Sequence, residues 1–262
     1  MSRLLAVANQ KGGVSKTTTT INLASSLAKL GQKVLAVDMD PQANLTSGLG
    51  QKGKAGNAGT VYDALTRPEP IADAAPFMIS TNVDGLTLLP ADQNLTGAEI
   101  ELVTLPHREE RLRMLLASAR ERFDDILIDC PPSLGLLTLN ALVAADAVVI
   151  PLHCEYFALE GLADLIGTMR RVRAALNPGL DIDGVLLTMC DERTNLGHQV
   201  ANDVRGFFKQ KVFRTVIPRN VRLGEAPSHG LPVMTYDPKS RGAEAYLNLA
   251  REVLERRAAP VA

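Results

Sequence analysis

The segment Asn9-Gln-Lys-Gly-Gly-Val-Ser-Lys-Thr-Thr18 decides the fold, because of what stands on either side of it. The apolar run Leu4–Ala8 has the length of a buried strand, and the pattern from about Thr17 to Leu30 is helical, with Gly31 at a common stop position. A glycine loop between a strand and a helix N-terminus directs backbone N–H groups at a bound phosphate, where the helix dipole also favours negative charge. The segment therefore predicts a phosphate-binding loop.

The side chains of this loop supply further parts of a nucleoside triphosphate site. The two glycines let the backbone approach the anion, Lys16 can reach the β- and γ-phosphates, and the Thr17 hydroxyl can ligate Mg²⁺. The common pattern GxxxxGK[ST] is not matched, because Gln10 and Ser15 occupy both of its glycine positions. The residues expected to contact the nucleotide are Lys11, Gly12, Gly13, Val14, Ser15, Lys16, Thr17 and Thr18.

Outward from the loop, apolar runs of strand length alternate with helical patterns. The runs are Lys33–Asp38, Gly85–Pro90, Asp125–Asp129, Ala147–Ile150 and Ile182–Thr188, and helical spacing of apolar residues recurs over 112–123, 159–169 and 246–254. Short continuous apolar runs are typical of strands buried on both faces, which indicates a parallel sheet. The expected fold is α/β, a doubly wound, mainly parallel β-sheet with helices on both faces, in one domain over residues 1–262.

Two of these runs end in carboxylates that a triphosphate site needs. The run Lys33–Asp38 leads into Met39-Asp-Pro-Gln42, and the run Asp125–Asp129 leads into Cys130-Pro-Pro-Ser133. Taken alone, an Asp at the end of a buried strand is commonly a cap or turn residue. Together with the phosphate loop, the carboxylates favour a magnesium-dependent ATPase, because hard oxygen ligands suit that ion.

Composition limits the class of protein. The 262 residues hold 28 Lys plus Arg and 29 Asp plus Glu, and this balance argues against a histone-like or tail-driven nucleic-acid binder. No apolar run approaches the roughly 20 residues of a membrane span, and the N-terminus lacks the features of a signal peptide, so a cytosolic protein is expected. Cys130, Cys154 and Cys190 are scattered without CxxC spacing, which predicts reduced thiols and neither a disulfide framework nor a zinc site.

The near-zero net charge hides an uneven distribution along the chain. Residues 193–262 hold 12 Lys or Arg and 6 Asp or Glu, whereas residues 1–192 hold 16 and 23. The C-terminal quarter is therefore basic. A solvated surface and a surface that binds a polyanion are both compatible with this charge.

The phosphate loop matches the deviant pattern KGGxxK[ST], with Lys11 as the additional lysine, and resembles the ParA/MinD superfamily of P-loop ATPases. The resemblance implies that Lys11 crosses to the partner's phosphates in an ATP-bound sandwich homodimer. It also implies that Asp40 orients the attacking water and that Asp129 and Thr17 hold Mg²⁺, with Lys11, Lys16 and Asp40 as the catalytic set. Ser15 departs from the glycine that most members carry.

Further blocks resemble the ParA/Soj type of chromosome or plasmid partition ATPase, namely Glu155–Gly161, Leu187–Leu196, Val216–Ser228 and Tyr236–Tyr246. This resemblance implies binding of double-stranded DNA without sequence preference, with Arg193 and Arg222 as DNA-binding residues. It further implies an adenine-side loop made of Pro218, Arg219 and Asn220, hydrolysis stimulated by a ParB-like partner, and a cytoplasmic, nucleoid-associated protein.

Two rival functions remain at this point. A MinD-like membrane-cycling ATPase shares the ATP sandwich but ends in a basic amphipathic helix, whereas the last helix here carries mixed charges opposite its apolar stripe, so no membrane partner is expected. A P-loop metabolic enzyme is the other rival. Its iron–sulfur version does not fit the scattered cysteines, but an amide ligase remains possible from sequence.

Overall fold

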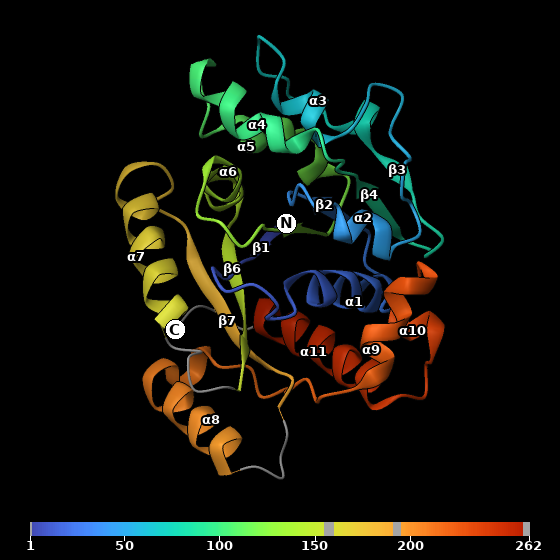
Figure 1. Cartoon of the computed structure of the whole chain (residues 1–262), viewed down its shortest axis with the longest axis vertical. Helices are drawn as coiled ribbons and strands as arrows, with labels where there is room; N and C mark the ends of the chain where they lie inside the picture. The colour runs from blue at the N-terminus through green and yellow to red at the C-terminus, as the bar shows by residue number, and fades with distance from the viewer. Residues whose placement is uncertain (1, 155–159, 191–194, 259–262) are drawn as a thin grey trace.

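The computed structural model describes residues 2–154, 160–190 and 195–258. Seven strands form one sheet in the order β3-β4-β2-β5-β1-β6-β7, and every neighbouring pair is parallel except β3 with β4 (Figure 1). The strands are β1 Arg3–Val7, β2 Val34–Asp38, β3 Ile79–Ser80, β4 Leu86–Leu89, β5 Asp125–Asp129, β6 Ala147–His153 and β7 Asp181–Thr188. The predicted doubly wound, mainly parallel sheet is confirmed.

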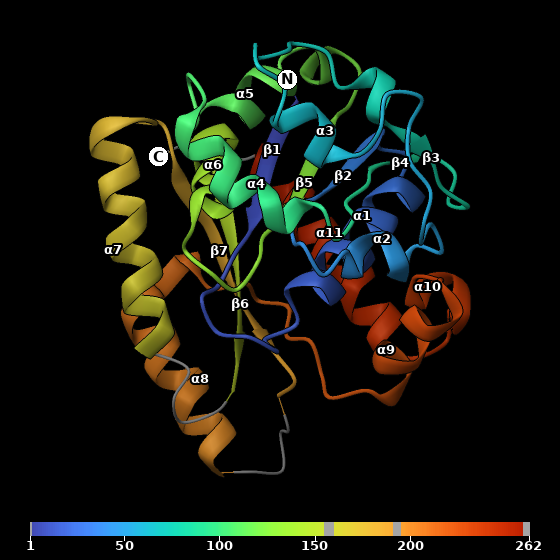
Figure 2. The same ribbon diagram turned by 45° about the horizontal axis from the view of Figure 1, so that its top comes forward.

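Helices cover both faces of the sheet. The helices are α1 Lys16–Lys29, α2 Asn44–Gly48, α3 Val61–Leu65, α4 Leu95–Glu101, α5 Arg111–Leu115, α6 Leu136–Ala144, α7 Glu160–Ala175, α8 Asn195–Phe208, α9 Val221–Glu225, α10 Val233–Tyr236 and α11 Arg241–Ala258. One hydrophobic core lies under α3 to α8, and a second lies under α1, α2, α10 and α11. Figures 1 and 2 show α11 running beside α1 on that second face.

The continuous apolar runs in the sequence follow from this double coverage. In β5, Ile126 and Ile128 belong to the first core, whereas Leu127, between them, belongs to the second. Successive side chains of a strand point to opposite faces, so a strand covered by helices on both faces carries apolar residues at consecutive positions.

Besides short helices such as α2, α3 and α4, which the sequence analysis does not predict, three elements differ from the expectation for a physical reason. The helical pattern over 112–123 breaks into α5 and a short 3₁₀ turn, Ser118–Glu121, although Leu112, Leu115 and Ala119 are all buried. The antiparallel strand β3 is only two residues long and has no pattern to read. Strand β6 is expected from the sequence to end at Ile150 but continues through Pro151 to His153. Proline has no backbone N–H to donate, and this is tolerated because the pairing of β6 with β1 already ends at Val149.

The prediction of three reduced thiols is wrong for two of them. Cys154 and Cys190 form a disulfide, with their Cα atoms 5.3 Å apart. Strands β6 and β7 are parallel neighbours with His153 opposite Thr188, so the residues that follow each strand meet although 36 positions separate them in the chain. Sequence spacing cannot detect such a contact. Cys130 is a free, buried cysteine, as expected for a small core residue.

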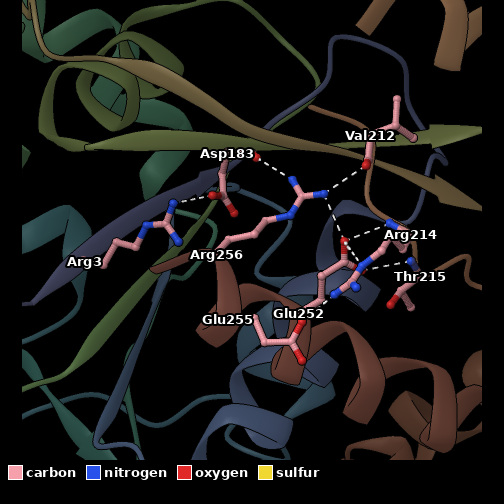
Figure 3. Close-up of polar contacts among 8 residues, drawn as sticks. All are labelled: Arg3, Asp183, Val212, Arg214, Thr215, Glu252, Glu255 and Arg256. Carbon is pink, nitrogen blue, oxygen red and sulfur yellow. Dashed lines mark hydrogen bonds and ion pairs between the residues drawn. The ribbon is translucent and has the colours of Figure 1, made fainter. Parts of the chain in front are cut away.

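The last helix is fastened to the sheet by polar contacts as well as by its apolar face (Figure 3). Glu252 is 3% exposed, and its carboxylate accepts hydrogen bonds from the backbone N–H groups of Arg214 and Thr215 at 2.8 and 2.9 Å. Arg256 donates to the Asp183 and Val212 carbonyls at 3.0 and 2.9 Å. Within the described residues, no helix is long and apolar enough to cross a membrane.

Candidate nucleotide site

The predicted phosphate loop connects the carboxyl end of β1 to the first turn of α1. Two hydrogen bonds hold it to the ends of β6 and β7, and a third lies within the loop. Asn9 donates through Nδ2 to the Pro151 carbonyl at 2.7 Å, and its Oδ1 accepts from the Lys11 N–H at 3.0 Å. Thr188 Oγ1 donates to the Val14 carbonyl at 3.3 Å. The loop is therefore positioned by contacts with the ends of neighbouring strands.

The backbone of the loop takes a conformation that favours glycine at two positions. Gly13 has φ +75° and Ser15, which directly precedes α1, has φ +71°. This left-handed conformation costs a residue with a Cβ roughly 1–2 kcal/mol, whereas glycine adopts it freely. Ser15 therefore stands at a position that suits the glycine expected there from the family resemblance. Its Oγ lies 3.4 Å from Nε2 of His153 at the end of β6.

Lys16 points its ammonium group back into the loop. The side chain is 7% exposed, and Nζ donates to the Lys11 carbonyl at 3.1 Å. Burial lowers the pKa of Lys16, while the nearby Asp129 and Asp40 act in the opposite direction. A buried cation that is incompletely solvated is suited to an anionic ligand such as a phosphate.

The Thr17 hydroxyl and the Asp129 carboxylate lie together beneath the loop. Thr17 Oγ1 donates to Asp129 Oδ2 at 2.7 Å, and Thr20 Oγ1 donates to Asp129 Oδ1 at 3.1 Å. Burial, with a further contribution from Asp38, raises the pKa of Asp129 to about 8. Two hard protein oxygens suit Mg²⁺, which usually retains waters and takes phosphate oxygens as its other ligands.

Asp38 and Asp40 have different surroundings although they are two residues apart. Asp38 is fully buried and accepts from the Thr46 N–H at 2.8 Å, from the Thr46 hydroxyl at 2.7 Å and from the Asp40 N–H at 3.2 Å. Burial raises the pKa of Asp38 to about 6. Asp40 instead accepts from the Gln42 N–H at 2.9 Å and lines the pocket. Asp38 thus orients the turn that presents Asp40.

These groups surround a cavity of about 340 Å³. It is lined by Gly12, Gly13, Ser15, Lys16, Thr17, Thr18, Asp40, Gln42, Asn44, Pro132 and Met189. Most of the residues expected to contact nucleotide are therefore brought together with Asp40. Val14 is 1% exposed and does not line this cavity. Asn44 and Met189 were missed, because they follow β2 and β7 with no motif that marks them.

The predicted adenine-side loop lies beside a second cavity. Pro218 is paired with Cys190, and the Arg219 N–H donates to the Cys190 carbonyl at 3.4 Å. A cavity of about 250 Å³ there is lined by Cys190, Thr215, Val216, Pro218, Arg241, Glu244, Ala245 and Asn248. Met189 lines the first cavity and Cys190 the second, so the two adjoin. The side-chain oxygen of Asn220 accepts from the Arg222 N–H at 2.8 Å and caps α9.

Of the two predicted DNA-binding arginines, one can be described. Arg222 is half exposed and pairs with Glu225 at 2.7 Å and with Asp237 at 3.2 Å. The hydrogen bond to Glu225 and the charges of both carboxylates raise the pKa of Arg222. A phosphate would have to compete with these two carboxylates. Arg193 lies outside the described residues.

A glycine loop on a β-strand, a buried lysine and a Thr–Asp pair at the end of a parallel sheet define a P-loop nucleoside triphosphatase. A family model described as "AAA domain" matches residues 2–182. The chain is 56% identical to the sporulation initiation inhibitor protein Soj of Bacillus subtilis over 97% of this chain and 98% of that protein. It is also 53% identical to the chromosome partitioning protein ParA of Myxococcus xanthus, over 98% of this chain and 89% of that protein. The chain belongs to the ParA/Soj family of deviant Walker A partition ATPases.

Solved structures with the same fold come from partition, division and metabolic proteins. Cobyrinic acid a,c-diamide synthase from Mycobacterium smegmatis, solved with an ATP analogue and magnesium, has a TM-score of 0.85 at 37% identity, covering 99% of this chain and 96% of that one. The cell division ATPase MinD of Pyrococcus furiosus has a TM-score of 0.76 at 30% identity, covering 97% and 99%. Both rival functions considered above are thus represented among similar structures.

Proposed function

We propose that this protein is a magnesium-dependent partition ATPase whose ATP-bound sandwich dimer binds double-stranded DNA without sequence preference. Hydrolysis, stimulated by a ParB-like partner, releases the DNA. The observation that carries the proposal is the convergence of Lys16, Thr17 and Asp40 on one cavity, with Asp129 bonded to Thr17, in a chain 56% identical to Soj. Such a protein would work in the cytoplasm on the nucleoid.

In this proposal Thr17 and Asp129 hold Mg²⁺, which neutralises charge on the phosphates of ATP. Lys16 contacts the same phosphates, and Asp40, which lines the same cavity, orients the attacking water. Lys11 reaches the phosphates bound by the partner subunit. A cation that arrives only in the assembled dimer would stabilise the transferring phosphoryl group and make hydrolysis depend on dimerisation.

The second cavity is the proposed site of the adenine base. It adjoins the phosphate cavity across consecutive residues, and Pro218 and the amide of Asn248 lie in its wall. Pro218 offers an apolar surface to a base, whereas Arg219 is exposed at this point and Asn220 is engaged as a helix cap. Backbone groups of the 218–220 loop are therefore the better candidates to read the base edge.

The proposed DNA surface includes Arg222 and Arg193, both in the basic C-terminal quarter of the chain. A dimer doubles the number of cations that face DNA phosphates, so binding would depend steeply on both ATP and salt. A dimer-dependent surface is consistent with a chain whose net charge is only −1.

The arrangement of α11 favours partition over membrane cycling. Its apolar residues Tyr246, Leu249 and Val253 are buried within the core shared with α1, so they offer no free face to a bilayer.

The other rival function, an amide ligase, needs a small acid as a further substrate. Phosphate release should therefore be measured with DNA plus the ParB-like partner, and separately with small carboxylic acids plus an ammonia donor. Stimulation only by DNA and partner is expected, and stimulation only by an acid would contradict the proposal.

A further inference from the structure

The disulfide between Cys154 and Cys190 lies at the edge of the sheet that carries the nucleotide site. Both cysteines are partly exposed, so small reagents can reach them. Cys130 differs from them, because burial and the neighbouring Asp129 raise the pKa of its thiol and keep it unreactive. The Cys154–Cys190 pair is the one pair among the chain's three cysteines that the structure joins.

Each cysteine follows a residue that contacts the nucleotide site. His153, before Cys154, lies 3.4 Å from the Ser15 hydroxyl of the phosphate loop. Met189, before Cys190, lines the phosphate cavity. The backbone of Cys190 also bonds to the predicted adenine-side loop and the residue before it: its N–H donates to the Ile217 carbonyl at 3.3 Å, and its carbonyl accepts from the Arg219 N–H at 3.4 Å. The crosslink therefore joins the segments that border both cavities.

Met189 is the residue most directly restrained by the crosslink. Its φ is +51°, in the left-handed region that residues with a Cβ adopt only at a cost. It stands between Thr188, which bonds to the Val14 carbonyl, and the crosslinked Cys190. The disulfide thus fixes the connection after β7 with the Met189 side chain in the wall of the phosphate cavity. Breaking the crosslink would free this connection to leave the strained conformation, and the Met189 side chain could then leave the cavity wall.

We propose that Cys154 and Cys190 form a thiol–disulfide modification site that controls nucleotide binding, with the oxidised form binding more weakly. The inference rests on the proposed function, since it assumes that the cavity takes a nucleotide.

The oxidant is a low-molecular-weight disulfide such as oxidised glutathione. One cysteine thiolate attacks a sulfur of that disulfide, breaks its S–S bond and releases one small thiolate. The second cysteine thiolate then attacks the mixed disulfide, forms the Cys154–Cys190 bond and releases the other. Two electrons pass to the small disulfide, which takes up the two protons lost by the protein thiols as it becomes two thiols. A small dithiol reverses both steps.

The test is nucleotide affinity measured with a fluorescent ATP analogue and Mg²⁺ after equilibration in oxidised or reduced glutathione. Peptide mass mapping in parallel reports whether residues 154 and 190 are joined. The reduced protein should bind the ATP analogue at least about fivefold more tightly than the oxidised protein does. Cys154→Ser should bind as tightly as the reduced wild type in both buffers.

Cys190→Ser should also lose the dependence on glutathione, which shows that the pair, and not one thiol alone, is responsible. The inference is overturned if the crosslink does not form in oxidised glutathione, or if the oxidised protein binds the analogue equally well or better. It is also overturned if Cys154→Ser keeps the dependence. Absence of nucleotide binding in both buffers would instead contradict the proposed function as well.

Discussion

At the scale of single residues, Asp40 is the group whose proposed role is easiest to isolate. Its carboxylate lines the phosphate cavity, whereas Thr17 and Asp129, which are bonded to each other, are the residues proposed to hold Mg²⁺. Asp40→Ala should therefore lose hydrolysis but retain Mg-ATP, and it should accumulate as an ATP-bound dimer on DNA. Size-exclusion chromatography with ATP checks this. A monomeric elution profile with ATP would contradict the role given to Asp40.

Asp38 gives the site a dependence on pH in the metal-free protein. Burial raises its pKa to about 6, above its ordinary value of 3.8. The folded state therefore holds the proton on Asp38 more tightly than the unfolded state does. Protonation of Asp38 thus stabilises the fold fully below pH 4, and this stabilisation is lost as the pH rises through 6. When the pH rises from 5 to 7, the unfolding free energy of Asp38→Asn should fall by about 1 kcal/mol less than that of the wild type.

The measurement is urea unfolding in the presence of a metal chelator. Asp84→Asn is the matched control, because Asp84 is exposed. Its unfolding free energy should change between pH 5 and 7 by as much as that of the wild type. An Asp38→Asn variant that loses as much stability as wild type would show that Asp38 is not protonated in this range.

At the scale of secondary-structure elements, helix α11 is fastened through Glu252, as Figure 3 shows. Glu252→Ala leaves two part-buried N–H groups, those of Arg214 and Thr215, without their acceptor and leaves Arg256 without its carboxylate. Unfolding free energy should fall by about 3 kcal/mol.

Glu255, one position before Arg256 in the same helix, supplies the matched control. It is exposed and pairs with Arg214, so Glu255→Ala should cost about 1 kcal/mol or less. Chemical denaturation measures both variants. Equal losses for the two substitutions would mean that Glu252 does not hold the helix to the sheet.

Elements that depend on local pattern could be predicted, and those that depend on distant contacts could not. The apolar runs predicted six of the seven strands, and the glycine loop predicted the position of α1. The break after Leu115 and the pairing of Cys154 with Cys190 arise from tertiary packing, which sequence spacing does not encode. The same limit applies to the site, where Met189 reaches the cavity only because β7 lies beside β6.

At the scale of the whole molecule, the uneven charge distribution is the feature that function must explain. Arg222→Ala should weaken DNA retention and lower the salt slope by about 1 per arginine removed, while ATP-dependent dimerisation persists. Arg251→Ala, an exposed arginine on α11, is the control and should retain DNA like wild type. Filter retention at several salt concentrations measures both. Unchanged binding by Arg222→Ala would remove Arg222 from the DNA surface.

The central claim is that nucleotide controls DNA binding, and the most direct test compares DNA retention with ATP, with ADP and without nucleotide, at two salt concentrations. Retention is predicted with ATP alone and should fall at higher salt. Lys11→Ala should bind nucleotide yet show little retention with ATP, since it lacks the lysine that crosses to the partner. Equal retention in all three nucleotide conditions would contradict the account.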